Sequence, residues 1–150
     1  MTRDIARELT VQLVFGFPVS GTDAEDYLDS FLSEEHFNSL QAEDPIYEEL
    51  PKGKMVTYIQ KTFFGVLDHL DEIDQTISRF SRGWSLNRLS GTARAVLRVA
   101  VYELVFASEE IPVGAAINSA VEIDKKYDGP EINAFVNGVL GSVSRDVKNN

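Results

Sequence analysis

The chain has 150 residues, of which 43% are hydrophobic and 25% are charged, as is typical of one soluble globular domain. It has no cysteine, which excludes disulfides, thiol catalysis and thiolate metal sites, and no apolar run approaches the ~20 residues of a membrane helix. The opening segment has early acids and no long apolar core, so we expect no secretory signal and a cytoplasmic location.

The formal net charge of −10 comes from one part of the chain. Residues 22–50 hold ten acids and no lysine or arginine, whereas the remaining residues hold 14 acids and 14 bases. From Gln75 to Tyr102 there is no acid, and this stretch carries five arginines. Because local charge decides what docks where, we expect an acidic flank and a separate basic band.

Apolar residues at steps of three or four predict helices from the start of the chain. Residues 3–17 form an amphipathic helix, which the sequence FPVSG at 17–21 interrupts. Thr22 and Glu25 fit a capping box at the start of a second helix, which ends near Leu32.

The middle of the chain begins with residues 37–52, whose prolines predict a loop or one short helix. Apolar residues then recur at every third or fourth position over 56–80, which predicts one helix of about 25 residues. Gly83 ends this helix, and residues 85–90 predict a short helical turn.

The last third of the chain predicts three helices. Residues 92–107 are apolar over most of the helix circumference, which predicts a helix in the centre of the fold. Pro112 is placed to start the next helix, and Pro130 starts the final one after the Asp128-Gly129 break. No segment alternates with period two for long enough to predict a strand, so the expected fold class is all-α.

Arg98 is a charged residue inside the apolar stripe of the expected central helix. A buried guanidinium needs an acidic partner, because burying it alone costs several kcal/mol. Glu122, on the following helix, is the partner that we expect from the sequence.

No catalytic constellation is present in the sequence. It contains neither a nucleophile elbow nor a phosphate-binding loop, and His36 and His69 do not have the spacing of metal ligands. We therefore expect no enzyme activity, no metal and no cofactor.

Several aromatic residues lie next to bases or amides. Phe80 and Trp84 alternate with arginines, Tyr127 follows two lysines, and Phe135 lies between two asparagines. Single-stranded RNA is bound by rings that stack on bases and by cations that pair with phosphates. The same rings also fit a hydrophobic core, because they recur at helical spacing.

Sequence blocks of the second half follow one another in a specific order: AVLRVAVYEL (95–104), IP (111–112), AINSAVEI (116–123), KKYDG (125–129) and FVNGVL (135–140). Together with GWSLNRLS (83–90) and RDIARELTVQLVF (3–15), they resemble the NusB family of bacterial transcription antitermination factors. The resemblance implies one NusB-like domain over 1–150, built from two small helical bundles at about 1–82 and 83–150.

The resemblance also implies a function. The family binds boxA-like single-stranded RNA of ribosomal RNA leaders, with the ribosomal small-subunit protein NusE as partner, in the transcription elongation complex. The resemblance assigns RNA-binding roles to Arg3, Arg7, Gln12, Tyr127 and Phe135. We add Asn133, which lies two residues before Phe135. Arg3 and Arg7 are four residues apart and are therefore expected on one side of their helix.

Some residues depart from the family pattern. Ala93 stands where an acid usually faces the protein partner, and Gly114 and Ala134 stand where bases are common. The missing acid implies a weaker contact with the protein partner, and the missing bases, with the net charge of −10, imply weaker RNA binding. An alternative function is therefore a NusB-fold adaptor between proteins with weakened RNA binding. A third alternative, the small domain of an RNA methyltransferase, requires an α/β domain after residue 150, whereas the ending VKNN is typical of a frayed natural end.

Overall fold

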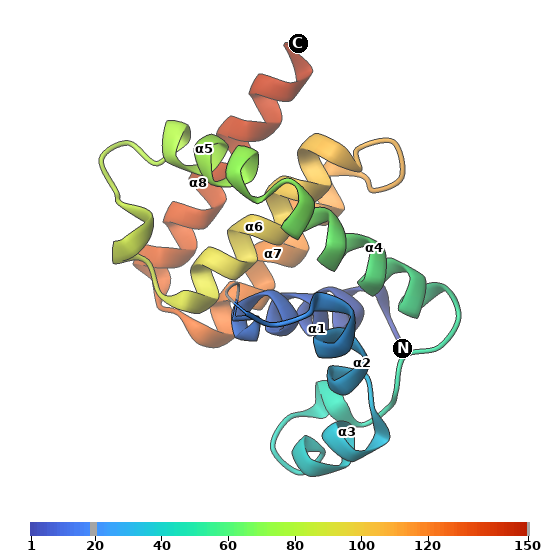
Figure 1. The fold of residues 1–150 in the computed structure, drawn as a ribbon. Coiled ribbons are helices and arrows are strands. Elements are labelled where there is room, and N and C mark those ends of the chain that lie inside the picture. Colours follow the sequence, from blue (N-terminus) through green and yellow to red (C-terminus); the bar gives the residue numbers. More distant parts are fainter. Residues whose placement is uncertain (19–20, 150) are drawn as a thin grey trace. The chain divides into compact units, whose positions relative to one another are not determined.

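The computed structural model describes residues 1–18 and 21–149, and every regular element in those ranges is a helix (Figure 1). The chain forms two compact units, Met1–Phe64 and a second unit that starts at Gly65. The sequence-based boundary lay near residue 82. In the structure the helix over residues 70–80 belongs to the second unit, because it packs against helices there.

The first unit begins with α1, Arg3–Gly16, as the periodicity predicted. The hydroxyl of Thr2 accepts a hydrogen bond from the backbone N–H of Ile5 at 3.2 Å, which caps the helix. Ala6, Leu9 and Leu13 are fully buried along one side. Within the expected break at 17–21, Val19 and Ser20 lie outside the described residues.

The acidic segment folds around a small aromatic cluster of its own. It contains α2 (Ala24–Phe31), α3 (Glu34–Leu40) and the short helix η1 (Pro45–Tyr47). Phe31, Phe37 and Tyr47 meet in pairs with ring centroids 5.2–6.3 Å apart, and all three are buried. The acids therefore lie around the outside of an apolar centre.

The start of α2 corrects the sequence-based prediction. Asp23 caps the helix by accepting a hydrogen bond from the backbone N–H of Asp26 at 3.0 Å. The capping box of Thr22 and Glu25 is therefore wrong, because the residue directly before the helix is already a carboxylate cap.

The single helix expected over 56–80 is two helices, α4 (Lys54–Asp68) and α5 (Leu70–Phe80). They are separated at His69, whose backbone lies outside the helical region at φ −115° and ψ 21°. The imidazole of His69 stacks on Phe106 with ring centroids 4.0 Å apart. Because apolar residues keep steps of three or four across the break, periodicity alone could not locate it.

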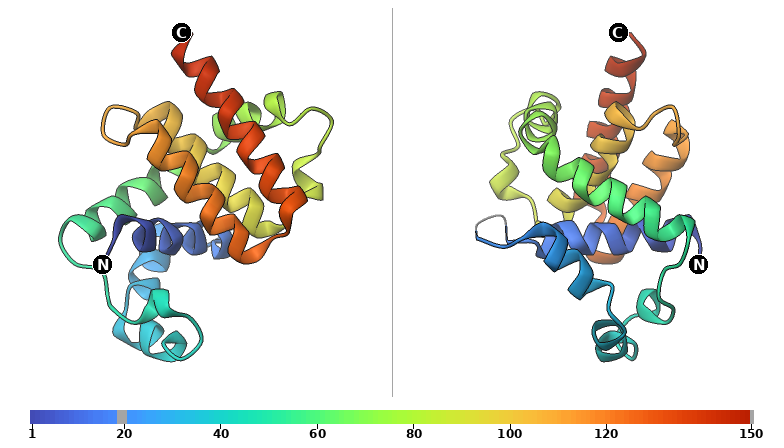
Figure 2. Two further views of the ribbon diagram at one scale, coloured as in Figure 1. Left: turned by 180° about the vertical axis from the view of Figure 1, so that it is seen from behind. Right: turned by 45° about the vertical axis from the view of Figure 1, so that its right-hand side comes forward.

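The second unit packs α5, α7 (Val113–Tyr127) and α8 (Pro130–Lys148) around α6 (Gly91–Phe106), and the short helix η2 (Leu86–Arg88) precedes α6 (Figure 2). Ten of the 16 residues of α6 are buried, which confirms the expected central helix of this unit. Gly65, in the last turns of α4, lies so close to Tyr102 that a Cβ atom would overlap the tyrosine ring.

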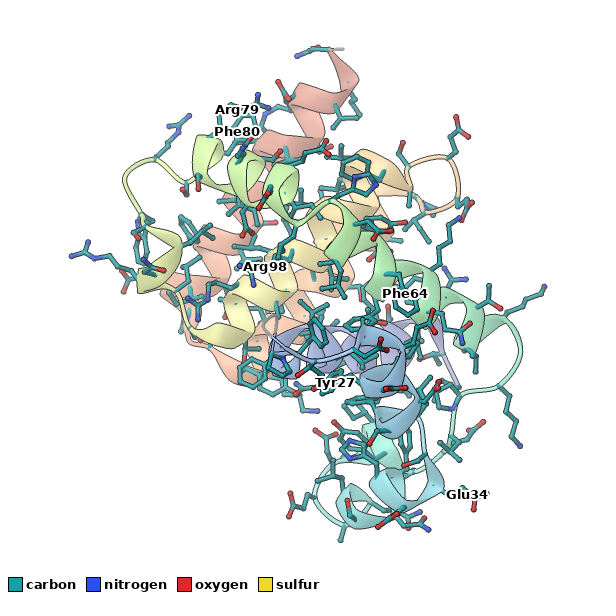
Figure 3. All side chains as sticks on the ribbon, viewed as in Figure 1. Tyr27, Glu34, Phe64, Arg79, Phe80 and Arg98 are labelled. Atoms are coloured by element: carbon teal, nitrogen blue, oxygen red, sulfur yellow. The ribbon has the colours of Figure 1, made fainter. Side chains whose placement is uncertain are left out.

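Arg98 has a different partner from the expected one. Its Nε and Nη2 atoms donate hydrogen bonds of 2.9 and 3.0 Å to the two carboxylate oxygens of Asp74 on α5 (Figure 3). Glu122 is mostly exposed on α7 and instead accepts from Lys125 at 2.9 Å. The predicted Arg98–Glu122 pair is therefore wrong, because the polar side of α6 faces α5.

We predict a measurable coupling between Arg98 and Asp74. A double-mutant cycle with Arg98→Met and Asp74→Leu should give a coupling energy of about 0.5–3 kcal/mol in thermal or urea unfolding, since the pair is bidentate and three-quarters buried. The exposed pair Lys125 and Glu122 is the control, with an expected coupling of about 0.2–0.5 kcal/mol. Additive effects for Arg98 and Asp74 would contradict the stabilising role of the bidentate contact.

Candidate nucleic-acid interface

In the first unit, Arg3 and Arg7 meet over the same aromatic ring. The guanidinium carbon of Arg3 lies 4.4 Å from the centroid of Tyr58, and that of Arg7 lies 5.7 Å from it. Tyr58 comes from α4, so a helix far along the sequence fixes the direction of both arginines. The sequence-based prediction that the two side chains share one side of α1 is confirmed.

The two arginines differ in accessibility. Arg3 is exposed, whereas only 2% of Arg7 is accessible and its Nη1 atom lies 3.3 Å from the carboxylate of Asp4. A phosphate can approach Arg3 directly, while the charge of Arg7 is engaged inside the fold. Gln12 is half-buried, nine residues and about 13 Å further along the helix than Arg3, and on another side of it.

In the second unit, Tyr127 and Asn133 lie on either side of the corner between α7 and α8. Tyr127 is the last residue of α7; it is 37% exposed, and the ammonium of Lys126 lies 5.6 Å from its ring centroid. Asn133 is half-buried, and its amide donates to the carboxylate of Asp124 at 2.7 Å and to the backbone carbonyl of Asp128 at 3.4 Å. Asn133 thus ties α8 to the end of α7.

Asp124 is a fully buried carboxyl group at this corner. Its Oδ1 atom has no hydrogen-bond partner, and burial, together with the neighbouring Asp128, raises its pKa to about 7. Asp128 in turn accepts a hydrogen bond from Ser90 at 3.1 Å. Sequence reasoning assigned no role to Asp124; an acid at helical spacing with the buried apolar residues of α7 is the signal that could have found it.

Phe135 follows Asn133 by two residues on α8. Its ring packs against Trp84 with centroids 4.9 Å apart and an interplanar angle of 33°, and both rings are half-buried. The sequence left core and stacking roles open for these rings. In the structure each ring packs against the other and keeps an accessible part, so both roles stay open.

The basic band lies mostly on the outside of the second unit. Arg82 and Arg88 are exposed. The guanidinium carbon of Arg79 lies 4.7 Å from the ring centroid of Phe80, and its Nη2 atom forms an ion pair with Oδ2 of Asp146 at 2.8 Å. Figure 3 shows Arg79 and Phe80 together at the end of α5. Among the residues that the structure describes, no group of three or more His, Cys, Asp or Glu residues could hold a metal ion, and no helix is long and apolar enough to cross a membrane.

Comparison with known proteins identifies relatives over nearly the whole chain. The model of the NusB family matches residues 4–145. The transcription antitermination protein NusB of Thermoanaerobacter sp. (strain X514) is 37% identical over 146 residues, which are 97% of this chain and 92% of that protein.

Solved structures agree with these relatives. The NusB structure of T. maritima has a TM-score of 0.78 and 31% sequence identity, and the match covers 97% of this chain and 92% of that one. A structure of the antitermination factors NusB and NusE in complex with double-stranded RNA matches with a TM-score of 0.73 over 96% of both chains. At 23% identity, this last likeness shows the fold alone.

The raised pKa of Asp124 predicts a pH-dependent stability. The folded chain retains a proton on this carboxyl up to about pH 7, whereas the unfolded chain loses it near its ordinary pKa of 3.8. The free energy of unfolding should therefore fall as the pH rises between these two values. Asp124→Asn keeps an oxygen for Asn133, and its free energy of unfolding should rise by about 4 kcal/mol relative to that of the parent chain between pH 4 and pH 8.

Urea unfolding at a series of pH values measures this difference. Asp71→Asn, at an exposed acid on α5, is the matched control. Its free energy of unfolding should change with pH in the same way as that of the parent chain. If the free energy of unfolding of Asp124→Asn followed that of the parent chain at every pH, the carboxyl of Asp124 would be charged in the folded state at neutral pH. The raised pKa of Asp124 would then be wrong as the cause of the pH dependence.

Proposed function

The chain belongs to the NusB family, and we propose that this transcription antitermination factor binds a boxA-like single strand of a ribosomal RNA leader together with the ribosomal protein NusE. As a member of this family it is a non-catalytic factor. The proposal places it in the bacterial cytoplasm, in the transcription elongation complex.

The full-length match to NusB antitermination proteins is the observation that carries this proposal. The structure of NusB and NusE with double-stranded RNA gives it a precedent, because a protein of the same fold forms one complex there with NusE and RNA. The surface chemistry of this chain supports it further: accessible arginines and half-exposed rings are the groups that bind phosphates and unstacked bases.

Each predicted RNA-binding residue then has a physical role. Arg3 offers an exposed cation to a phosphate, and its contact with Tyr58 limits the directions that its side chain can take. Tyr127 and Phe135 offer partly exposed rings to bases. Asn133 sets the α7–α8 corner between those two rings through its bond to Asp124.

Arg7 and Gln12 act less directly in this proposal. The buried guanidinium of Arg7 helps to hold Tyr58, on which Arg3 rests, and so positions the accessible cation. Gln12 is partly accessible at a separate place on α1, where it reaches a different nucleotide from Arg3.

The adaptor alternative rests on Gly114 and Ala134, which are exposed on α7 and α8 at positions where bases are common in the family. These two changes remove cations that pair with RNA phosphates, so they weaken RNA binding and leave the protein contacts as the main function. Titration of a labelled boxA-like RNA, with and without NusE, separates the two functions. Absence of RNA binding at low salt even with NusE present would favour the adaptor.

We predict that Arg3 contributes one phosphate contact. Arg3→Gln should weaken binding of the boxA-like strand and reduce the slope of log K against log salt by about 0.7, the contribution of one neutralised phosphate on a single strand. Fluorescence anisotropy over a series of salt concentrations measures both quantities. Lys52→Gln removes an exposed cation elsewhere in the same unit and is the matched control.

The control should leave the slope nearly unchanged. Equal losses for Arg3→Gln and Lys52→Gln would show that only net charge matters, and the phosphate contact of Arg3 would then be refuted. Melting temperatures of both variants report whether either change disturbs the fold.

A further inference from the structure

A groove of about 370 Å³ lies in the second unit, between the end of α5 with its following loop and one side of α8. Its walls include the rings of Trp84 and Phe135 and the side chains of Arg82 and Arg145. This volume lies within the range of small-ligand sites, about 300–1,000 Å³. The groove has room for one nucleotide and is too small for a duplex.

The aromatic wall can take a base on its outer face. Trp84 and Phe135 contact each other, so no ligand fits between them, but both rings are only half-buried and both line the groove. A base that stacks on one of these rings therefore enters from the groove side.

Two arginines line the same groove. Arg82 is exposed and belongs to the loop, while Arg145 is exposed on α8 and donates to the hydroxyl of Ser142 at 3.2 Å. Asp146 is the carboxylate next to Arg145, and Arg79 neutralises it through a 2.8 Å contact. The groove is therefore positive, which fits an anion.

The backbone of Arg82 has a left-handed conformation, with φ 44°. This conformation is uncommon for a residue other than glycine, asparagine or aspartate, and strain of this kind is often kept at functional sites. In the next residue, Gly83, φ is 89°. This turn holds the guanidinium of Arg82 at the rim of the groove.

Gly138 keeps the α8 side of the groove open. A glycine inside a helix costs about 1 kcal/mol relative to alanine. The fold does not require it here: a Cβ at Gly138 would meet no atom within 4 Å, and its φ is not positive. A larger side chain at this position would project into the groove, which Gly138 lines.

We propose that this groove binds one nucleotide of a single-stranded RNA, with the base stacked on the Trp84–Phe135 wall and the phosphates paired with Arg82 and Arg145. The inference rests on the proposed RNA-binding function and extends the RNA path from Phe135 along α8. RNA is favoured over an acidic peptide because the groove combines accessible aromatic rings with two arginines, and nucleotides alternate a flat base with a phosphate.

Gly138→Glu and Gly138→Gln form a matched pair of variants. Both fill the same open space and both replace glycine by a good helix former, so both should fold at least as stably as the parent chain. Only the glutamate brings a negative charge to the groove. We expect Gly138→Glu to weaken binding of the boxA-like RNA at least fivefold relative to Gly138→Gln, with a smaller ratio at high salt.

Trp84 is the only tryptophan of the chain, so its fluorescence reports directly on the groove. The boxA-like RNA should quench this fluorescence in the parent chain with the same midpoint as the anisotropy titration. A nucleoside monophosphate at the same concentration should quench much less, because it lacks the neighbouring contacts of the strand. Equal quenching by the mononucleotide would overturn the assignment to a single strand.

The outcomes separate this inference from the function on which it rests. If the RNA binds but neither quenches Trp84 nor distinguishes the two Gly138 variants, the groove is not on the RNA path and the proposed function stands. If Gly138→Glu spares RNA binding and weakens NusE binding, the groove takes a protein and the inference is wrong. If the parent chain binds no RNA with or without NusE, both proposals fail.

Discussion

Enclosing α6 is the constraint on which the second unit depends. This helix is apolar over most of its circumference, so α5, α7 and α8 must cover it to remove its side chains from water. The guanidinium of Arg98 points from α6 toward α5, where both carboxylate oxygens of Asp74 accept its hydrogen bonds. The packing of α7 and α8 against α6 also sets the corner that carries Tyr127, Asn133 and Phe135.

The sequence predicted the helices well because each one covers a face at steps of three or four residues. It could not locate the break at His69, since the same steps continue through it, and it could not choose between acids for Arg98, because that choice depends on how helices pack. At the candidate site, the shared side of Arg3 and Arg7 followed from their spacing. The burial of Arg7 against Tyr58 did not, since Tyr58 is distant in sequence.

A net charge of −10 does not prevent local cationic surfaces in this protein. The acids of residues 22–50 surround their own aromatic cluster in the first unit. In the second unit, Arg79 neutralises Asp146, so the positive groove is not offset by the nearest carboxylate. Long-range attraction to a polyanion is therefore weak, and recognition depends on contacts within about one Debye length, roughly 8 Å at physiological salt.

The close approach of Gly65 to Tyr102 links the identities of two residues that are far apart in the sequence. Any side chain at position 65 would overlap the tyrosine ring, so a substitution there requires a smaller residue at position 102 in the same lineage. During divergence the two positions should change together: homologues that carry alanine or serine at 65 should lack a large aromatic at 102. The packing of the last turns of α4 against α6 thus leaves a covariation signal that neither position would show alone.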